Sequence, residues 1–145
     1  RVLFRSVNLN DVLFQMLLED LFERYGSMLS IHQLFIPELV LLLRRGGIEQ
    51  QFMSRLSDNL AKLRDYGDVC IRKKKSNMEY LVGQSPLCSM RFLLPGSNIR
   101  VLFVYQNEMV YLLTAFHERA GHQNTAYPKY TPIAKQRFNE LKKGD

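Results

Sequence analysis

A polar segment near the end of the chain, residues 116–130, holds most of the side chains suited to acid–base chemistry. It reads FHERAGHQNTAYPKY, and it combines proton-exchanging His, Glu, Lys and Tyr with arginine, which keeps its charge. Metal-free cleavage of RNA needs a base for the 2′-hydroxyl proton, a cation facing the phosphorane and an acid for the leaving 5′-oxygen. The candidate catalytic residues here are His117, Glu118, Arg119, His122 and Tyr127, and the candidate RNA contacts are Lys129 and Tyr130. A solvated polar loop is the alternative interpretation, and for either histidine alone a non-catalytic role is favoured.

Two arginines interrupt stretches that otherwise have the composition of buried strands. Arg91 lies within LCSMRFLL and Arg100 within NIRVLFVY. Because a buried unpaired charge is costly, each guanidinium must reach solvent, a partner or a cleft. Two arginines on neighbouring strands can share one face and hold a phosphate between them. We therefore predict that both lie on the open face of a sheet, with Arg91 in the catalytic set and Arg100 among the RNA contacts; two solvent-facing arginines without a ligand are the alternative.

A run of four basic residues lies at the boundary between two halves of opposite charge. The first 71 residues carry 8 Lys/Arg and 9 Asp/Glu, a net charge of −1, whereas residues 72–145 carry 12 and 5, a net charge of +7. A basic half favours an anionic partner, with nucleic acid as the first candidate. The run Arg72, Lys73, Lys74 and Lys75 is therefore added to the predicted RNA contacts. A solvated basic surface without a ligand is the alternative.

Other kinds of chemistry lack their sequence signals. The chain has no glycine-rich phosphate loop, no metal-ligand cluster and no nucleophile elbow. The acidic residues of the basic half are scattered, which argues against a nuclease that holds metal ions between clustered carboxylates. We therefore expect neither a metal nor a cofactor.

The elements that must position these residues follow from hydrophobic periodicity. A short strand is predicted over residues 30–35, followed by a helical hairpin over residues 37–43 and 48–66. Residues 69–75 are predicted as a strand or loop. Three strands over residues 87–94, 98–105 and 109–116 then form an antiparallel meander, and a helix over residues 131–143 ends the pattern. The predicted fold is α+β: a small antiparallel sheet packed against the helical hairpin, with the last helix near the sheet edge.

The N-terminal region, residues 1–27, is interpreted separately from a domain over residues 28–145. Residues 1–6 read RVLFRS, which is one translated frame of a common sequencing-adapter oligonucleotide, so we exclude them from functional interpretation. Residues 8–25 have helical spacing and are predicted to be an extra helix on the domain, with upstream reading frame that is never expressed as the alternative.

The cellular environment is predicted from the cysteines and from the apolar runs. Cys70 and Cys88 match no metal-binding spacing and suit a reduced cytosolic chain better than a disulfide scaffold. No apolar run is long enough to span a bilayer, and the first residues do not read as a secretory signal. A cytoplasmic protein without a membrane partner is expected.

The ordered set of C-terminal motifs resembles the RelE/HigB-type toxins of type II toxin–antitoxin systems. The motifs are PLCSMRF, NIRVLFVY, MVYLLTAFHER and AYPKYTPIAKQRFNEL. In that family a strand ends in arginine, strands of the form "yRvlY" and "ivLLhgF" follow, and a helix reads "eI..A..R". The matching positions are Arg91, Arg100, Phe116, Ala134 and Arg137. The resemblance covers residues 30–143, and only the ordered set, not any one motif, is specific.

This resemblance implies a ribosome-dependent endoribonuclease that cleaves mRNA in the ribosomal A site by metal-independent acid–base chemistry. It also implies a cognate antitoxin, with a helix-turn-helix protein expected. Many members carry two lysines after the phenylalanine, where this chain has His117, Glu118 and Arg119. The departure leaves two alternatives open: a ParE-like toxin that inhibits gyrase, and a non-catalytic nucleic-acid-binding module.

Overall fold

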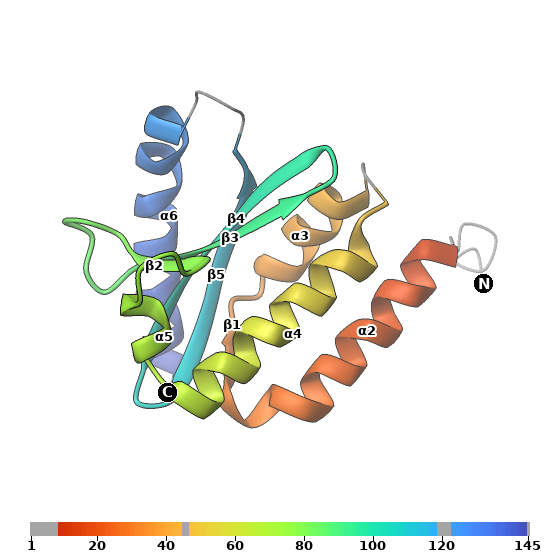
Figure 1. Ribbon diagram of the computed structural model, residues 1–145, viewed down its shortest axis with the longest axis horizontal. Helices are drawn as coiled ribbons and strands as arrows, with labels where there is room; N and C mark the ends of the chain where they lie inside the picture. The colour runs from red at the N-terminus through yellow and green to blue at the C-terminus, as the bar shows by residue number, and fades with distance from the viewer. Residues whose placement is uncertain (1–8, 45–46, 119–122, 145) are drawn as a thin grey trace.

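The computed structural model describes residues 9–44, 47–118 and 123–144, which form a central sheet with helices on both faces (Figure 1). Helix α6 covers one face of the sheet, α3 and α4 cover the other, and α2 lies outside α4. Along the chain the elements are α2 (Leu9–Tyr25), η1 (Gly26–Met28), β1 (Leu29–Ile31), α3 (Phe35–Arg44), α4 (Glu49–Tyr66), α5 (Val69–Arg72), β2 (Met78–Tyr80), β3 (Cys88–Leu94), β4 (Ser97–Gln106), β5 (Met109–His117) and α6 (Gln123–Gly144).

The sheet has five strands in the order β1-β5-β4-β3-β2. The predicted meander is confirmed as β3, β4 and β5, which pair antiparallel. The β4–β5 turn consists of Asn107 and Glu108, both with positive φ, as a two-residue hairpin turn requires. The prediction of a wholly antiparallel sheet is wrong, because β1 pairs parallel to β5. Three residues of β1 carry too little pattern to predict their partner.

The predicted helical hairpin is confirmed as α3 and α4. Their apolar stripes, including Leu39 and Leu43 on α3 and Phe52, Leu56 and Leu60 on α4, are fully buried. These residues form one continuous core with the side chains on the facing side of the sheet. The hairpin thus contributes packing to the domain, as its sequence pattern predicts.

Helix α6 is longer than predicted and lies elsewhere on the sheet. It begins at Gln123, eight residues before the predicted start, and it contains Pro128 and Pro132. These prolines are four residues apart and both are exposed, so they share the solvent side of the helix, where water can bond the carbonyl groups that lack an N–H partner. The helix packs over β4 and β5 across one face of the sheet, whereas the sequence predicted it near the edge.

The segment after α4 forms a short helix and a strand. Residues Val69–Arg72 are the helical turn α5, not the predicted strand or loop, and Met78–Tyr80 form the edge strand β2. The sequence did not predict β2, because three residues are too few for alternation to be recognised. Between them the chain carries Lys73, Lys74 and Lys75 along the edge of the sheet.

The helix predicted for the N-terminal region is α2. Its buried residues are Phe14, Leu18, Leu21 and Tyr25, which join the core beside α4. Three other apolar residues of this helix, Val12, Leu13 and Met16, are exposed. The interpretation of residues 1–6 falls outside the described residues. Within the described parts of the chain, no helix combines the length and the apolar character needed to cross a membrane.

Candidate nucleic-acid interface

Arg91 on β3 and Arg100 on β4 are direct cross-strand neighbours in the antiparallel register. Residues on either side of them, Met90, Phe92 and Ile99, lie in the core cluster under α3 and α4. Because side chains alternate along a strand, both arginines lie on the opposite face, the one that α6 partly covers. The prediction of a shared face is therefore confirmed. The face is not open throughout, however, and only Arg91 is exposed, whereas Arg100 is buried.

Buried Arg100 is neutralised by Glu118. Its Nε and Nη2 atoms each lie 2.9 Å from Oε1 of Glu118, which also accepts a hydrogen bond from Nδ2 of Asn98 at 3.3 Å. Glu118 is only 4% exposed, so this ion pair is shielded from water. Its carboxylate, predicted to take part in proton exchange, thus serves as the counter-ion of Arg100.

Tyr127 on α6 lies between Arg100 and the core. Its ring packs edge-on against Phe116, the guanidinium of Arg100 lies 5.8 Å from its ring centroid, and its hydroxyl is 3.1 Å from that of Ser89. Burial raises the pKa of Tyr127, so the phenol stays protonated at neutral pH and can act as a hydrogen-bond donor but not as a base.

Of the other predicted residues in the 116–130 segment that the structure describes, His117 and Tyr130 lie on opposite faces of the sheet. His117 pairs in register with Ile99, which places it on the α3/α4 face of the sheet, although its side chain is exposed. Tyr130 stacks on Phe116 at 4.3 Å and is half-buried, while Lys129 lies over the Tyr130 ring at 5.3 Å. Tyr130 therefore contributes to the α6–sheet core. Arg119 and His122 lie outside the described residues.

The basic run lies beside the two arginines. Residues 71–79 curve around a hollow of about 380 Å³ that Arg91 and Arg100 close from the sheet side. The main chain holds this arrangement, because the Arg91 N–H donates to the Asn77 carbonyl at 2.8 Å. Lys75 has a φ of 64°, an uncommon conformation for a residue with a side chain, and it turns the chain toward β2. The residues lining this basic cleft are Ile71, Arg72, Lys73, Lys74, Lys75, Ser76, Asn77, Met78, Glu79, Arg91 and Arg100.

The basic cleft keeps a large excess of positive charge. Glu79 is the only acidic residue among the described residues that line it, and its Oε1 lies 3.8 Å from Nη1 of Arg100. Arg72 is paired with Asp68 at 3.2 Å, and Arg100 with Glu118. Among the described residues, Lys73, Lys74, Lys75 and Arg91 have no acidic partner within salt-bridge distance. Uncompensated cations gathered in a concave site attract an anion, and phosphate is one of the anions that arginine can bind with two parallel hydrogen bonds.

The remaining polar clusters have structural roles. Arg137 on α6 reaches past the sheet edge and donates to both carboxylate oxygens of Glu38 on α3, at 2.7 and 2.6 Å, and to the Leu113 carbonyl at 3.0 Å. It therefore ties together the two helical layers. In the part of the chain that the structure describes, no three His, Cys, Asp or Glu side chains are grouped so as to hold a metal ion.

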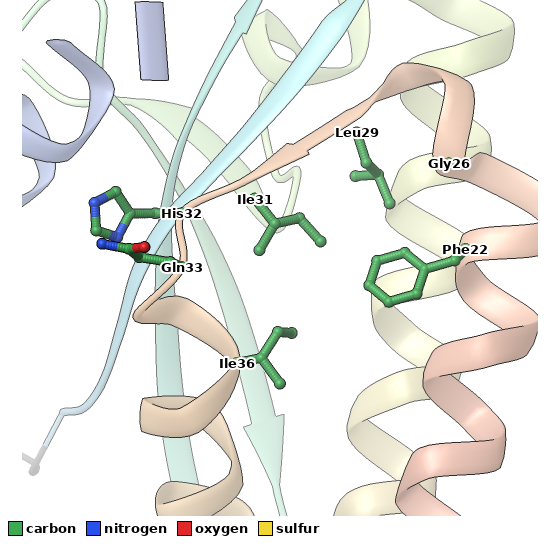
Figure 2. Close-up of a pocket in the computed structure, with 7 residues that line it drawn as sticks. All are labelled: Phe22, Gly26, Leu29, Ile31, His32, Gln33 and Ile36. Carbon is green, nitrogen blue, oxygen red and sulfur yellow. The ribbon is translucent and has the colours of Figure 1, made fainter. Parts of the chain in front are cut away.

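A second hollow, of about 330 Å³, is mainly apolar (Figure 2). Phe22, Leu29, Ile31 and Ile36 surround it, with His32 at the end away from Phe22. The ring of His32 is already engaged: its Nδ1 accepts the Leu34 N–H at 3.2 Å and its Nε2 lies 2.7 Å from Glu140. Among the described residues that line this hollow, His32 is the only one with an acid–base side chain, and it is already hydrogen-bonded, so the basic cleft is the better candidate.

Sequence reasoning missed the lining residues Ile71, Ser76, Asn77, Met78 and Glu79 of the basic cleft, and also Ser89 and Asn98, which contact Tyr127 and Glu118. Ser89 lies two residues before Arg91, so period-2 alternation could have placed it on the same face. Glu79 belongs to β2, which was not predicted. Asn98 acts through Glu118, and no spacing in the sequence signals that contact.

No protein-family model matches the chain, and no curated protein or solved structure is similar enough to count as a match.

Proposed function

We propose that the protein binds RNA through the basic cleft and acts as a RelE/HigB-type toxin that cleaves mRNA on the ribosome. The observation that supports this most directly is the cross-strand pair Arg91–Arg100 facing the lysines of residues 73–75. Such a cleft suits a polyanion, because each phosphate contact releases counter-ions and the binding gains from several lysines at once. A cognate antitoxin protein, with a helix-turn-helix fold expected, belongs to the same proposal.

The proposed reaction needs few groups of the protein's own. The 2′-oxygen attacks the phosphorus and loses its proton to a base, and the bond to the 5′-oxygen breaks as that oxygen gains a proton. Arg91 is exposed in the basic cleft and is suited to stabilise the charge that develops on the phosphorane. Glu79 is the one carboxylate among the described lining residues, which makes it the best-placed base. The ring of protonated Tyr127 packs against the guanidinium of Arg100 and helps to hold it in place.

A non-catalytic nucleic-acid-binding module is the second candidate. It is favoured by the engagement of Glu118 with Arg100 and by the position of His117 on the other face, which leave the basic cleft sparse in proton-transfer groups. A ParE-like gyrase inhibitor is a third candidate. Mapping cleavage of translated messages after expression separates the first candidate from both, and a supercoiling assay with purified gyrase identifies the third.

Binding is tested with a labelled RNA oligonucleotide by fluorescence anisotropy over a range of salt concentrations. The double variant Lys73→Gln/Lys74→Gln should lower the slope of log affinity against log salt by about 1 for each lysine that neutralises a phosphate in the parent complex. Lys75 is left unchanged because of its unusual backbone conformation. The matched control, Arg24→Gln/Lys135→Gln, removes the same charge from exposed positions that do not line the basic cleft. Equal slopes for the two variants would show that only net charge matters and would count against the basic cleft.

A further inference from the structure

A larger hollow lies on the other side of the basic run. It measures about 690 Å³, within the range of roughly 300–1,000 Å³ typical of ligand pockets. Residues 73–77 line both this hollow and the basic cleft, so a bound chain that crosses them would contact both. Its lining residues are Lys62, Tyr66, Val69, Cys70, Lys73, Lys74, Lys75, Ser76 and Asn77.

Tyr66 distinguishes this hollow from a simple basic patch. It is the last residue of α4, and Gly67, with a φ of 64°, then turns the chain into α5. Tyr66 is 68% exposed, although a tyrosine in a packed domain gains by burying its ring. Lys62 lies one turn earlier on the same side of α4. An exposed aromatic ring beside a row of lysines is the arrangement that proteins use to stack a base while holding the strand's backbone.

We propose that the ligand of this protein is single-stranded RNA, with one unpaired base stacked on Tyr66 and the adjoining backbone held by residues 73–75 and the basic cleft. This inference rests on the proposed function, and it specifies the form of RNA that is bound. A duplex keeps its bases stacked inside, so it can offer its phosphates to the lysines but no base face to Tyr66.

The first test compares three RNA ligands of equal length. They are a single strand, the same strand without its bases, and the duplex that the base-containing strand forms with its complement. Tyr66→Ala should weaken binding of the base-containing single strand about five- to one-hundred-and-fifty-fold, the range expected when one stacked base is no longer supported. It should leave binding of the abasic strand unchanged, and the duplex should bind the parent protein more weakly than the single strand does. Tyr66→Phe should keep the parent affinity because the π-face remains. Phe22→Ala is the matched control, an exposed aromatic outside both basic hollows.

The second test uses Cys70, which lines the same hollow. Bound single-stranded RNA should slow its alkylation by iodoacetamide. The signal is specific to Cys70 because the only other cysteine, Cys88, is fully buried, and burial raises the pKa of Cys88 to about 12. The pKa of Cys70 is also raised, mainly by burial, so the reaction is best followed at mildly alkaline pH.

The outcomes separate this inference from the proposed function. If Tyr66→Ala binds the base-containing strand as tightly as the parent, if the duplex competes equally with the single strand, or if saturating RNA leaves Cys70 alkylation unchanged, the stacking inference is overturned. The proposed function survives that result provided that Lys73→Gln/Lys74→Gln still weakens binding. If the parent protein binds none of the three strands, the proposed function itself fails and the inference fails with it.

Discussion

Glu79 differs from every other side chain that lines the basic cleft, because it brings a negative charge to the place where a phosphate is proposed to bind. Its side chain is 59% exposed and its ion pair with Arg100 is loose, at 3.8 Å. A carboxylate that only balanced charge would be expected closer to a cation and better shielded from water. These features leave the carboxylate accessible to a ligand in the basic cleft.

Replacing Glu79 should therefore change binding and cleavage in opposite directions. Glu79→Gln removes a repulsive charge, so RNA affinity should rise by up to about fivefold, the scale of an exposed charge interaction. If Glu79 is the base, single-turnover cleavage on programmed ribosomes should fall by about 10²–10⁴-fold. Glu108→Gln, which removes an exposed acid from the β4–β5 turn, is the control. Tighter binding with unchanged cleavage would assign Glu79 to charge balance alone.

The Arg100–Glu118 pair should matter for stability more than for catalysis. Glu118→Ala leaves a buried guanidinium with only the loose contact to Glu79, so the free energy of unfolding should fall by about 3–5 kcal/mol. The double variant Arg100→Met/Glu118→Met removes both charges and should lie much closer to the parent. Urea denaturation of Arg100→Met, Glu118→Met and the double variant measures the coupling. Additive effects would mean that the pair does not act as a unit.

At the scale of the elements, α6 is a helix that contains two prolines, Pro128 and Pro132, although proline is disfavoured inside a helix. Pro132 removes one internal hydrogen bond from the helix, and an interior proline costs about 3 kcal/mol relative to alanine. Pro132→Ala should therefore raise the free energy of unfolding, by up to that amount, because the residue is exposed and its ring contributes little packing. The shift of the urea midpoint measures the gain, with Pro37→Ala in the first turn of α3 as the control, where the missing N–H has no intrahelical partner. A lower stability of Pro132→Ala would show that the ring makes a contact the helix needs.

The same elements show which parts of the fold were predictable from the sequence. Long periodic patterns such as those of α4, β4 and β5 are local signals, and they predicted the type and approximate limits of these elements. The parallel partner of β1, the strand β2 and the start of α6 depend on contacts with distant residues, which periodicity does not report. The shared face of Arg91 and Arg100 was predictable because alternation and a meander together fix it. The Arg100–Glu118 pair was not predictable, because Glu118 directly follows the last residue of β5 and its position depends on the path of the chain after that strand.

At the scale of the whole molecule, α2 is expected to stabilise the domain without shaping either basic hollow. Neither hollow includes a residue of α2, whereas four of its apolar side chains are buried beside α4. A chain starting at Met28 should therefore bind RNA with the parent affinity and keep any toxicity. It should be less soluble and unfold more easily, because residues such as Met53 would be uncovered. Anisotropy and thermal unfolding of the shortened chain measure the two effects, and a folded, soluble sample that no longer binds RNA would assign α2 to the functional domain.

The pairing of β1 with β5 also sets an order of events in time. At about 5–20 residues per second, ribosomes add the residues between Ile31 and Val110 in on the order of ten seconds. Throughout that interval the first strand has no partner, and Arg137, which joins the two helical layers, follows later still. Arg100 likewise has no buried counter-ion until Glu118 has been synthesised. A nascent chain therefore carries the lysine run before it can complete the basic cleft, because Arg100 gains its buried counter-ion only after Glu118 has been synthesised.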